Sequence, residues 1–129
     1  MMNSKFYICP DCGTLVEMIH DSGIAPSCCG MKMDELRPNS FEASGEKHIP
    51  AVSVDGDLVT VNVGSVDHPM QSAHYIQWVQ LVTENGVQRQ MLRPDQPPKV
   101  VFSLNGEKPL AVYAYCNLHG LWKTELNNA

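Results

Sequence analysis

Residues 75–92 read YIQWVQLVTENGVQRQML, with Asn85-Gly86 between two stretches that have the composition of β-strands. Asn and Gly accept the positive φ angles of a type I′ turn, which is a favoured two-residue connection in β-hairpins. We therefore predict an antiparallel hairpin from residues 75–83 and 87–92. Its Trp78 is expected in the hydrophobic core, as is Trp122 later in the chain.

Further strands are predicted on both sides of this hairpin. Residues 58–63 (LVTVNV) alternate apolar and polar side chains with period two and follow an Asp55-Gly56 turn. Residues 100–104 and 110–115 flank Asn105-Gly106, which predicts a second hairpin. No stretch has sustained helical periodicity. Several short strands with regularly spaced turn signals predict an all-β protein built on a β-sandwich.

Composition and charge exclude several classes of protein. A formal charge of −5 argues against a nucleic-acid binder, which needs a basic face. No apolar run approaches the roughly 18–20 residues that span a bilayer, and the N-terminus lacks the pattern of a secretory signal. We therefore expect a cytoplasmic protein without nucleic-acid or membrane partners, in which the five cysteines are metal ligands or reactive thiols rather than disulfides.

Cysteine and histidine divide the chain into two parts. Residues 1–36 hold four of the five cysteines, whereas residues 46–129 hold the fifth and four of the five histidines. The polar, turn-prone residues 37–45 lie between them and are expected to form a linker. The first part has too few apolar residues for a core of its own, so a bound metal is expected to hold it together.

The first predicted metal site combines Cys9-Pro10-Asp11-Cys12-Gly13 with Cys28-Cys29-Gly30. Two thiolates three residues apart can bind one ion, and Gly13 permits the positive φ that the tight turn needs. Four thiolates suit tetrahedral zinc or iron, and the sequence leaves these two metals nearly even. A vicinal or transient disulfide is the less favoured alternative.

The second predicted site uses ligands that are scattered along the sandwich. Cys116 and His119 are three residues apart after a strand, His68 and His74 flank a turn, and His48 follows the linker. Loops gather at the ends of a sandwich, so these side chains are expected to converge there. Imidazoles with one thiolate favour iron, copper or zinc. A blue-copper site is not expected, because no Met follows His119 and there are too many histidines.

Read together, the motifs resemble the desulfoferrodoxin family, the two-iron superoxide reductases. The matching segments are these, in chain order and over nearly the whole chain: Cys-Pro-Asp-Cys-Gly, Cys-Cys-Gly, Glu-Lys-His-Ile-Pro, Gly-Ser-Val-Asp-His-Pro-Met, His-Tyr-Ile-Gln-Trp and Tyr-Cys-Asn-Leu-His-Gly-Leu-Trp. Each motif is weak alone, and the ordered set is specific.

The resemblance implies a desulforedoxin-like or rubredoxin-like iron domain in residues 1–36, a linker in 37–45 and a catalytic immunoglobulin-like β-sandwich in 46–129. The first iron would be bound by four cysteines: Cys9, Cys12, Cys28 and Cys29. The second iron would be bound by four histidines in a plane and an axial cysteine: His48, His68, His74, His119 and Cys116. Glu46 would take the sixth position of the oxidised iron, and Lys47 would lie above the open face of the ferrous iron.

The function implied is the one-electron reduction of superoxide to hydrogen peroxide, without oxidation of a second superoxide. The resemblance also implies a rubredoxin-type electron donor and a homodimer formed through residues 1–36. Lys47 could steer the anion inward and hydrogen-bond to the reduced oxygen. The alternatives are a non-catalytic iron protein that only transfers electrons, and an interaction module held together by zinc.

Overall fold

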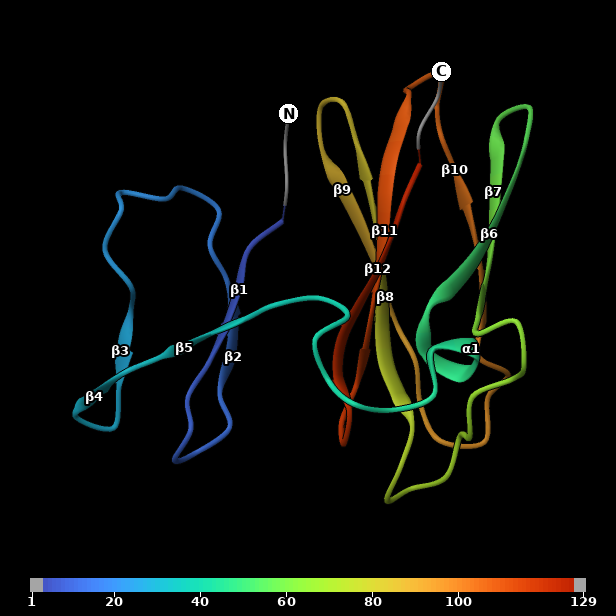
Figure 1. Ribbon diagram of the computed structural model, residues 1–129. Helices are drawn as coiled ribbons and strands as arrows, with labels where there is room; N and C mark the ends of the chain where they lie inside the picture. Colours follow the sequence, from blue (N-terminus) through green and yellow to red (C-terminus); the bar gives the residue numbers. More distant parts are fainter. Residues whose placement is uncertain (1–3, 127–129) are drawn as a thin grey trace. The chain divides into compact units, whose positions relative to one another are not determined.

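The structure, a computed structural model, describes residues 4–126 (Figure 1). The contacts within the chain divide it into two compact units, Met1–Arg37 and Pro38–Ala129.

The first unit consists of five very short strands. They are β1 (Phe6–Ile8), β2 (Leu15–Glu17), β3 (Ser27–Cys28), β4 (Met31–Lys32) and β5 (Asp34–Leu36). One sheet has the order β2-β1-β5 and the other pairs β3 with β4, with all pairings antiparallel. Among the described residues, one buried cluster of this unit contains Tyr7, Cys9 and Met33 with a few half-buried neighbours, and Phe6 is buried as well. A core of that size cannot hold so small a unit together without another constraint.

The second unit is built from two antiparallel sheets (Figure 1). The three-stranded sheet has the order β10-β7-β6, and the four-stranded sheet has the order β12-β11-β8-β9. The strands are β6 (Pro50–Asp55), β7 (Leu58–Val63), β8 (Ile76–Thr83), β9 (Val87–Met91), β10 (Lys99–Ser103), β11 (Pro109–Cys116) and β12 (Gly120–Glu125). One turn of helix, α1 (Gly45–His48), precedes β6.

Alternating side chains from both sheets fill the space between them. In β7, Val59, Val61 and Val63 are fully buried while the residues between them are not, which is the period of a strand with one covered face. These three valines belong to the hydrophobic core cluster of the second unit, which also contains Ile76, Val79, Leu81, Leu92, Val100, Phe102, Leu104, Val112, Ala114 and Cys116. Inward-facing residues from two sheets in one cluster define a sandwich, so the all-β prediction is confirmed.

One of the two predicted hairpins is confirmed and the other is wrong. β8 and β9 do pair as an antiparallel hairpin around Asn85-Gly86, although neither of these two residues has the positive φ of the expected type I′ turn. Asn105 and Gly106 do adopt left-handed φ angles of 52° and 79°, yet β10 pairs with β7 and β11 pairs with β8 and β12. The reason is Asp57, whose carboxylate accepts the backbone N–H groups of Asn105 and Gly106 at 3.2 and 2.9 Å. This bonding ties the turn to the β6–β7 connection, and the chain crosses between sheets.

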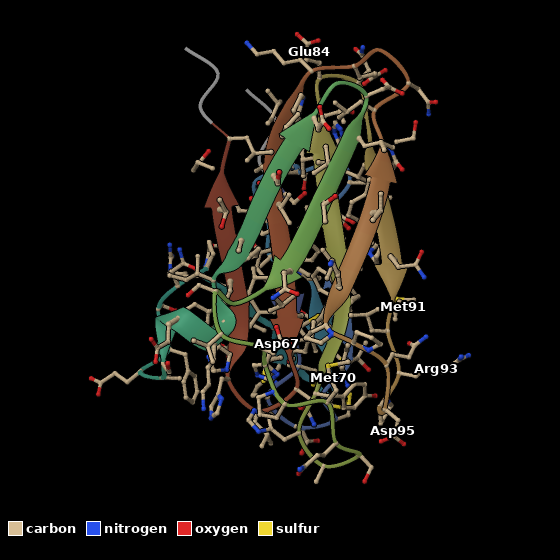
Figure 2. All side chains as sticks on the ribbon, turned by 90° about the vertical axis from the view of Figure 1, so that its right-hand side faces the viewer. Asp67, Met70, Glu84, Met91, Arg93 and Asp95 are labelled. Atoms are coloured by element: carbon tan, nitrogen blue, oxygen red, sulfur yellow. The ribbon has the colours of Figure 1, made fainter. Side chains whose placement is uncertain are left out.

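The loop after β7 and the loop that contains Asp95 lie at the same end of the sandwich. Figure 2 shows Asp67, Met70 and Asp95 at this end and Glu84 at the other. The loop after β7 is fastened here, because the backbone N–H of Asp95 donates to Met70 O at 2.9 Å and Asn62 Nδ2 donates to Asp67 Oδ1 at 2.9 Å. Within residues 4–126, no helix has the length and apolar character needed to cross a membrane.

Candidate metal centres

The first unit brings four cysteines together. The sulfur atoms of Cys9, Cys12, Cys28 and Cys29 all lie within 4.8 Å of one another, and all four thiols are free. The Sγ atoms of Cys12 and Cys28 are 3.5 Å apart, and those of Cys28 and Cys29 are 3.8 Å apart. Sulfurs about 2.3 Å from a shared tetrahedral ion would be separated by about 3.8 Å. The cysteine cluster therefore has the dimensions of a tetrahedral metal site.

The local backbone explains how adjacent cysteines can share one ion. Cys29 has a left-handed φ of 53°, and Gly30 after it has a φ of 72°. A non-glycine residue in this region is strained, and here the strain turns the chain so that both sulfurs face the cluster. On the other side, the backbone N–H of Cys12 donates to Cys9 Sγ at 3.4 Å.

The thiols of this cluster oppose one another's ionisation. A hydrogen bond with the Thr14 hydroxyl is the largest cause that lowers the pKa of Cys12, to about 6. The neighbouring Cys12 then raises the pKa of Cys29 to about 12 and also raises that of Cys28. Negative charge on one sulfur thus opposes ionisation of the next, and only a bound cation allows all four to be thiolates.

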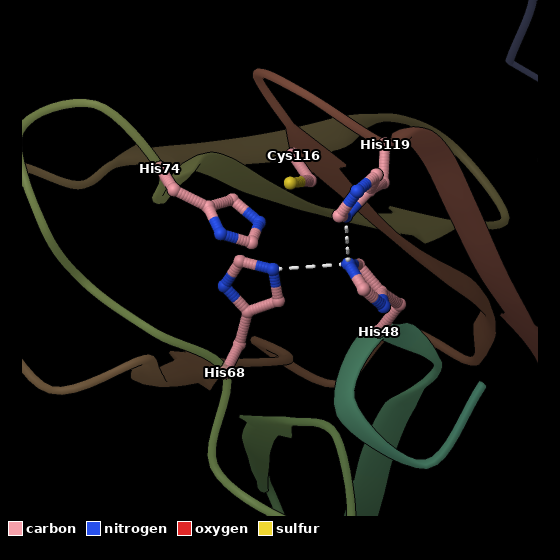
Figure 3. A group of neighbouring side chains, drawn as sticks. All are labelled: His48, His68, His74, Cys116 and His119. Carbon is pink, nitrogen blue, oxygen red and sulfur yellow. Dashed lines mark hydrogen bonds between the residues drawn. The ribbon is translucent and has the colours of Figure 1, made fainter. Parts of the chain in front are cut away.

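The second unit brings four histidines and one cysteine together. Ligand atoms of His48, His68, His74, Cys116 and His119 all lie within 4.8 Å of one another. Adjacent imidazole rings have centroids 4.5 to 4.9 Å apart, and the His48–His74 pair across the group is 6.5 Å apart. This diagonal is close to √2 times the side, so the rings stand at the corners of an approximate square in which His48 lies opposite His74. Figure 3 shows the Cys116 sulfur behind this square.

Hydrogen bonds fix which ring nitrogens face the centre. Nδ1 of His48 lies 2.6 Å from Ser44 O, and Nδ1 of His68 lies 2.7 Å from Pro69 O. A carbonyl only accepts, so both Nδ1 atoms carry the hydrogen and both Nε2 atoms present lone pairs. These Nε2 atoms are 3.0 Å apart, and His119 Nδ1 is also 3.0 Å from His48 Nε2.

Lone pairs that face each other at this distance repel unless a cation lies between them. If His119 Nδ1 carries a hydrogen, it can donate to the lone pair of His48 Nε2, but the lone pair of His68 Nε2 stays without a donor. In addition, Nε2 of His74 is buried and has no hydrogen-bond partner. Nitrogens about 2.1 Å from one ion and at right angles to each other would be about 3.0 Å apart. The donor atoms therefore fit a single transition-metal ion.

Burial sets the protonation of these ligands. It lowers the pKa of His68 to about 4 and also lowers the pKa values of His48 and His74, so the three rings are neutral near pH 7. Burial raises the pKa of Cys116, partly offset by the N–H groups of Leu118 and His119 that point at its sulfur. Neutral imidazoles bind a metal directly, while the thiol must first lose its proton.

Comparison with known proteins identifies the family. The family model described as Desulfoferrodoxin matches residues 40–125. A desulfoferrodoxin from Syntrophotalea carbinolica is 43% identical over 121 residues, which cover 94% of this chain and 95% of the relative. The crystal structure of the superoxide reductase from Treponema pallidum has a TM-score of 0.79 and 37% identity, and it covers 96% of this chain and 100% of that one. The chain belongs to the desulfoferrodoxin family.

A third relative is a superoxide reductase (1Fe-SOR) from Giardia intestinalis. It has a TM-score of 0.54 and 30% identity, and the alignment covers 64% of this chain and 99% of that one. In the present chain, the four-cysteine group and the group of four histidines and one cysteine match the two iron sites of the desulfoferrodoxin family. Family membership therefore assigns iron rather than zinc to the first site, a choice between metals that the residue pattern alone left open.

Backbone packing in this desulfoferrodoxin fixes α1, the helix that carries His48. The backbone N–H of Gly64 donates to Ile49 O at 3.1 Å, and that of Val66 donates to Glu46 O at 2.9 Å. Gly64 has a φ of +83°, and a Cβ there would lie 2.6 Å from both Glu46 O and Lys47 C. Only glycine allows this close approach. The Gly-Ser-Val segment was recognised in the sequence, but its packing on α1 was not.

A side-chain clamp fixes His74. Asn117 Nδ2 donates to Ala73 O at 3.1 Å, and Asn117 Oδ1 accepts the backbone N–H of Tyr75 at 3.0 Å. Asn117 thus holds the residues on both sides of His74 next to the strand end that carries Cys116. The sequence offered no signal for this role beyond the position of Asn117 between two predicted ligands.

The two other predicted site residues lie beside the metal group rather than in it. Glu46 and Lys47 are both exposed on α1, next to His48. The carboxylate of Glu46 is not among the five grouped ligands. Burial is the main cause that lowers the pKa of His48, and a backbone hydrogen bond to Ser44 opposes it. The neighbouring histidines and, least of all, the charge of Lys47 lower it further. His20, which the sequence gave no role, is exposed in the first unit.

Proposed function

We propose that this chain is a superoxide reductase that converts superoxide to hydrogen peroxide at the second site, formed by the four histidines and Cys116, and does not oxidise a second superoxide. The observation that carries the proposal is the square of imidazoles with a thiol on one side. Five protein donors would leave a six-coordinate ion one position for a small ligand. Membership in the desulfoferrodoxin family supports the same activity.

Iron bound by these residues would supply the single electron that, with two protons, turns superoxide into hydrogen peroxide. The residues of the chain set the charge of the site. Lowered pKa values keep His48, His68 and His74 neutral, so Cys116 gives the donor set a charge of −1 once its thiol ionises. A divalent ion would leave a net charge of +1 within a chain whose formal charge is −5. A local positive charge attracts an anionic substrate.

Lys47 is proposed to strengthen that attraction. Its ammonium is exposed on α1, one residue from His48. Burial is the main cause that lowers the pKa of His48, and the charge of Lys47 adds a small further lowering. We expect Lys47→Ala to slow the reaction with superoxide and to reduce its dependence on ionic strength. Lys108→Ala is the matched control, because Lys108 is exposed and its carbonyl accepts from Glu84 N at the far end of the sandwich. Equal rates for the two variants at every salt concentration would remove Lys47 from the mechanism.

Glu46 is proposed to offer its carboxylate to the oxidised centre. Its backbone is held by Val66 N and Ser65 Oγ, while its side chain is exposed and free to turn. A carboxylate that binds only after oxidation would protect the site from other anions without excluding superoxide from the reduced form.

Stoichiometry tests the proposed reaction against its alternatives. The reduced protein is mixed with a known amount of superoxide, and peroxide and oxygen are measured. A reductase yields one peroxide per superoxide and no oxygen, whereas a dismutase yields half as much peroxide together with oxygen. A protein that only transfers electrons should neither react rapidly nor change its spectrum with azide. Cys116→Ser should abolish the reaction and leave the first site intact; turnover at the unchanged rate would contradict the assignment of Cys116.

We also propose iron on Cys9, Cys12, Cys28 and Cys29 as a structural or electron-relay centre and not as the site of reaction. Four thiolates leave a tetrahedral ion without a free position. A rubredoxin-type protein is the proposed electron donor. Free thiols throughout the chain support a cytoplasmic location, where cysteines stay reduced.

Homodimerisation through residues 1–36 is proposed from the apolar surface of the first unit. Ile19 is 96% exposed and Ile24 is 76% exposed, although each would gain from burial. Sedimentation velocity should show a dimer, and the double variant Ile19→Ser, Ile24→Ser should shift it to a monomer. A monomer for the unchanged protein would exclude this interface.

A further inference from the structure

Trp122 lies between two of the histidine ligands and contacts both. Its ring stacks on that of His48 with centroids 4.8 Å apart and an interplanar angle of 26°. Its indole N–H donates to the carbonyl oxygen of His119 at 3.0 Å. Trp122 and His48 are each 3% exposed, so water does not compete for either contact. Sequence reasoning placed this tryptophan in the hydrophobic core, but its ring faces the metal group.

The two contacts restrain two different parts of the fold. His48 comes from α1, before the first strand of the sandwich, whereas His119 comes from the tight turn between β11 and β12. Nε2 of His48 and Nδ1 of His119 must stay 3.0 Å apart to share an ion. A single rigid side chain that touches both residues fixes this separation more firmly than either segment could alone.

The position of Trp122 is itself fixed on both sides. Asn39, with a left-handed φ of 60°, bonds to the residues that flank Trp122 in β12. Its backbone N–H donates to Leu121 O at 3.0 Å, and its side chain exchanges bonds of 2.8 and 3.1 Å with the backbone of Lys123. On the opposite edge, Trp122 pairs with Ala114 of β11. The backbone that carries the indole is therefore held between Asn39 and β11.

We propose that Trp122 is a positioning residue of the second site, which holds His48 by stacking and His119 through its backbone carbonyl. The stack also responds to the metal. An imidazole that binds a cation loses electron density, and the electron-rich face of an indole attracts such a ring more strongly. Trp122 therefore stabilises the metal-bound arrangement over the metal-free one. This inference rests on iron binding at the site, which the proposed function also needs, but not on the reaction with superoxide.

The test is the rate at which reduced, iron-loaded protein gives up iron from the second site to an excess of a ferrous chelator. Trp122→Phe keeps a stacking ring and loses the N–H donor, and Trp122→Leu loses both. Loss of residues that orient metal ligands typically costs 10- to 100-fold in affinity. We expect release to be about tenfold faster for Trp122→Phe and about 100-fold faster for Trp122→Leu, with unchanged release from the first site.

The matched control is Trp78→Phe, which makes the same chemical change where the ring stacks on Tyr115 and lies under the Arg89 guanidinium. It should leave iron release unchanged. The sequence has two tryptophans, so in this variant all indole emission comes from Trp122. That emission should be quenched by iron in the second site and should recover as iron leaves, which gives a second, independent measure of iron release from that site.

Two results would overturn the proposal. One is release from Trp122→Phe at the rate of the unchanged protein. The other is faster release that is explained by a lower unfolding midpoint alone. In that case Trp122→Phe and Trp78→Phe would show the same relation between iron release rate and unfolding midpoint. Release rates in the expected order, in a protein that does not reduce superoxide, would instead refute the proposed function and leave the role of Trp122 standing.

Discussion

Gly64→Ala is the most direct test of how the fold positions the second site. Gly64 lies after β7 with a φ of +83°, and its Cβ would lie 2.4 Å from Val66 O and 2.6 Å from both Glu46 O and Lys47 C. All three atoms belong to the backbone, so no flexible side chain can swing aside to make room. The turn must therefore open and α1 must move away.

The structure gives the size of that movement. Ordinary van der Waals contact begins at 3.4 Å, so α1 must retreat by 3.4 − 2.6 = 0.8 Å and the turn must widen by 3.4 − 2.4 = 1.0 Å. His48, at the end of α1, holds its Nε2 only 3.0 Å from its two neighbours in the square. A left-handed alanine costs about 1–2 kcal/mol and overpacking about 1–3 kcal/mol, so we expect a loss of about 2–5 kcal/mol in unfolding free energy. Second-site iron affinity should fall about 10- to 100-fold.

The assay compares Gly64→Ala with Gly56→Ala. Gly56 also has a positive φ, +58°, but a Cβ there meets nothing within 4 Å. Gly56→Ala therefore measures the cost of the backbone conformation alone, and the difference between the variants measures the steric clash. Urea unfolding of the iron-loaded proteins and iron analysis of each site give the two quantities. Equal unfolding free energies for both variants, with full iron occupancy in Gly64→Ala, would refute the argument.

Three further predictions address other parts of the molecule. Asn117→Ala removes the clamp on His74 and should weaken second-site iron about tenfold without affecting the first site, as metal analysis after chelation would show; unchanged retention would mean that the loop holds His74 unaided. In metal-free protein, burial lowers the pKa of His68 to about 4 from 6.5, as well as those of His48 and His74, so the unfolded chain binds more protons below pH 6.5. Stability should be full above pH 6.5 and decline as the pH falls toward 4, and a flat urea midpoint over this range would contradict it. Cys12→Ser should unfold the first unit and leave the second-site spectrum unchanged, because the small core around Tyr7 needs the metal; a first unit that stays protected from proteolysis would count against this.

Much of the fold follows from local sequence. Alternation in residues 58–63 correctly predicted β7, because period-two burial is a local property. Asn85-Gly86 correctly marked the connection of the β8–β9 hairpin, although its backbone does not have the positive φ angles of a type I′ turn. Asn105-Gly106 shows the limit of such reasoning. Its backbone has the conformation of a hairpin turn, yet hydrogen bonds to Asp57, far away in the sequence, direct the chain to the other sheet.

For the candidate sites, too, the ligands could be predicted from the sequence but the residues that position them could not. The residue types of both metal groups were named from spacing, motif order and resemblance, and the structure gathers the same nine side chains. The residues that hold them were not found. Asn117 acts through bonds to Ala73 and Tyr75, and Gly64 acts through the space that it leaves empty. Neither property has a local pattern.

By itself, the sequence determined the chemistry of this protein: which side chains can bind metal, that the second set lies at strand ends and in loops, and which family they resemble. Only the tertiary structure decided that four imidazoles form a square, which of their nitrogens face inward, and that Trp122 packs on one of them. The physical reason is the separation along the sequence of the residues that determine each property. Ligand type and strand period are encoded within a few residues, whereas the arrangement of lone pairs depends on backbone atoms that folding brings from distant segments.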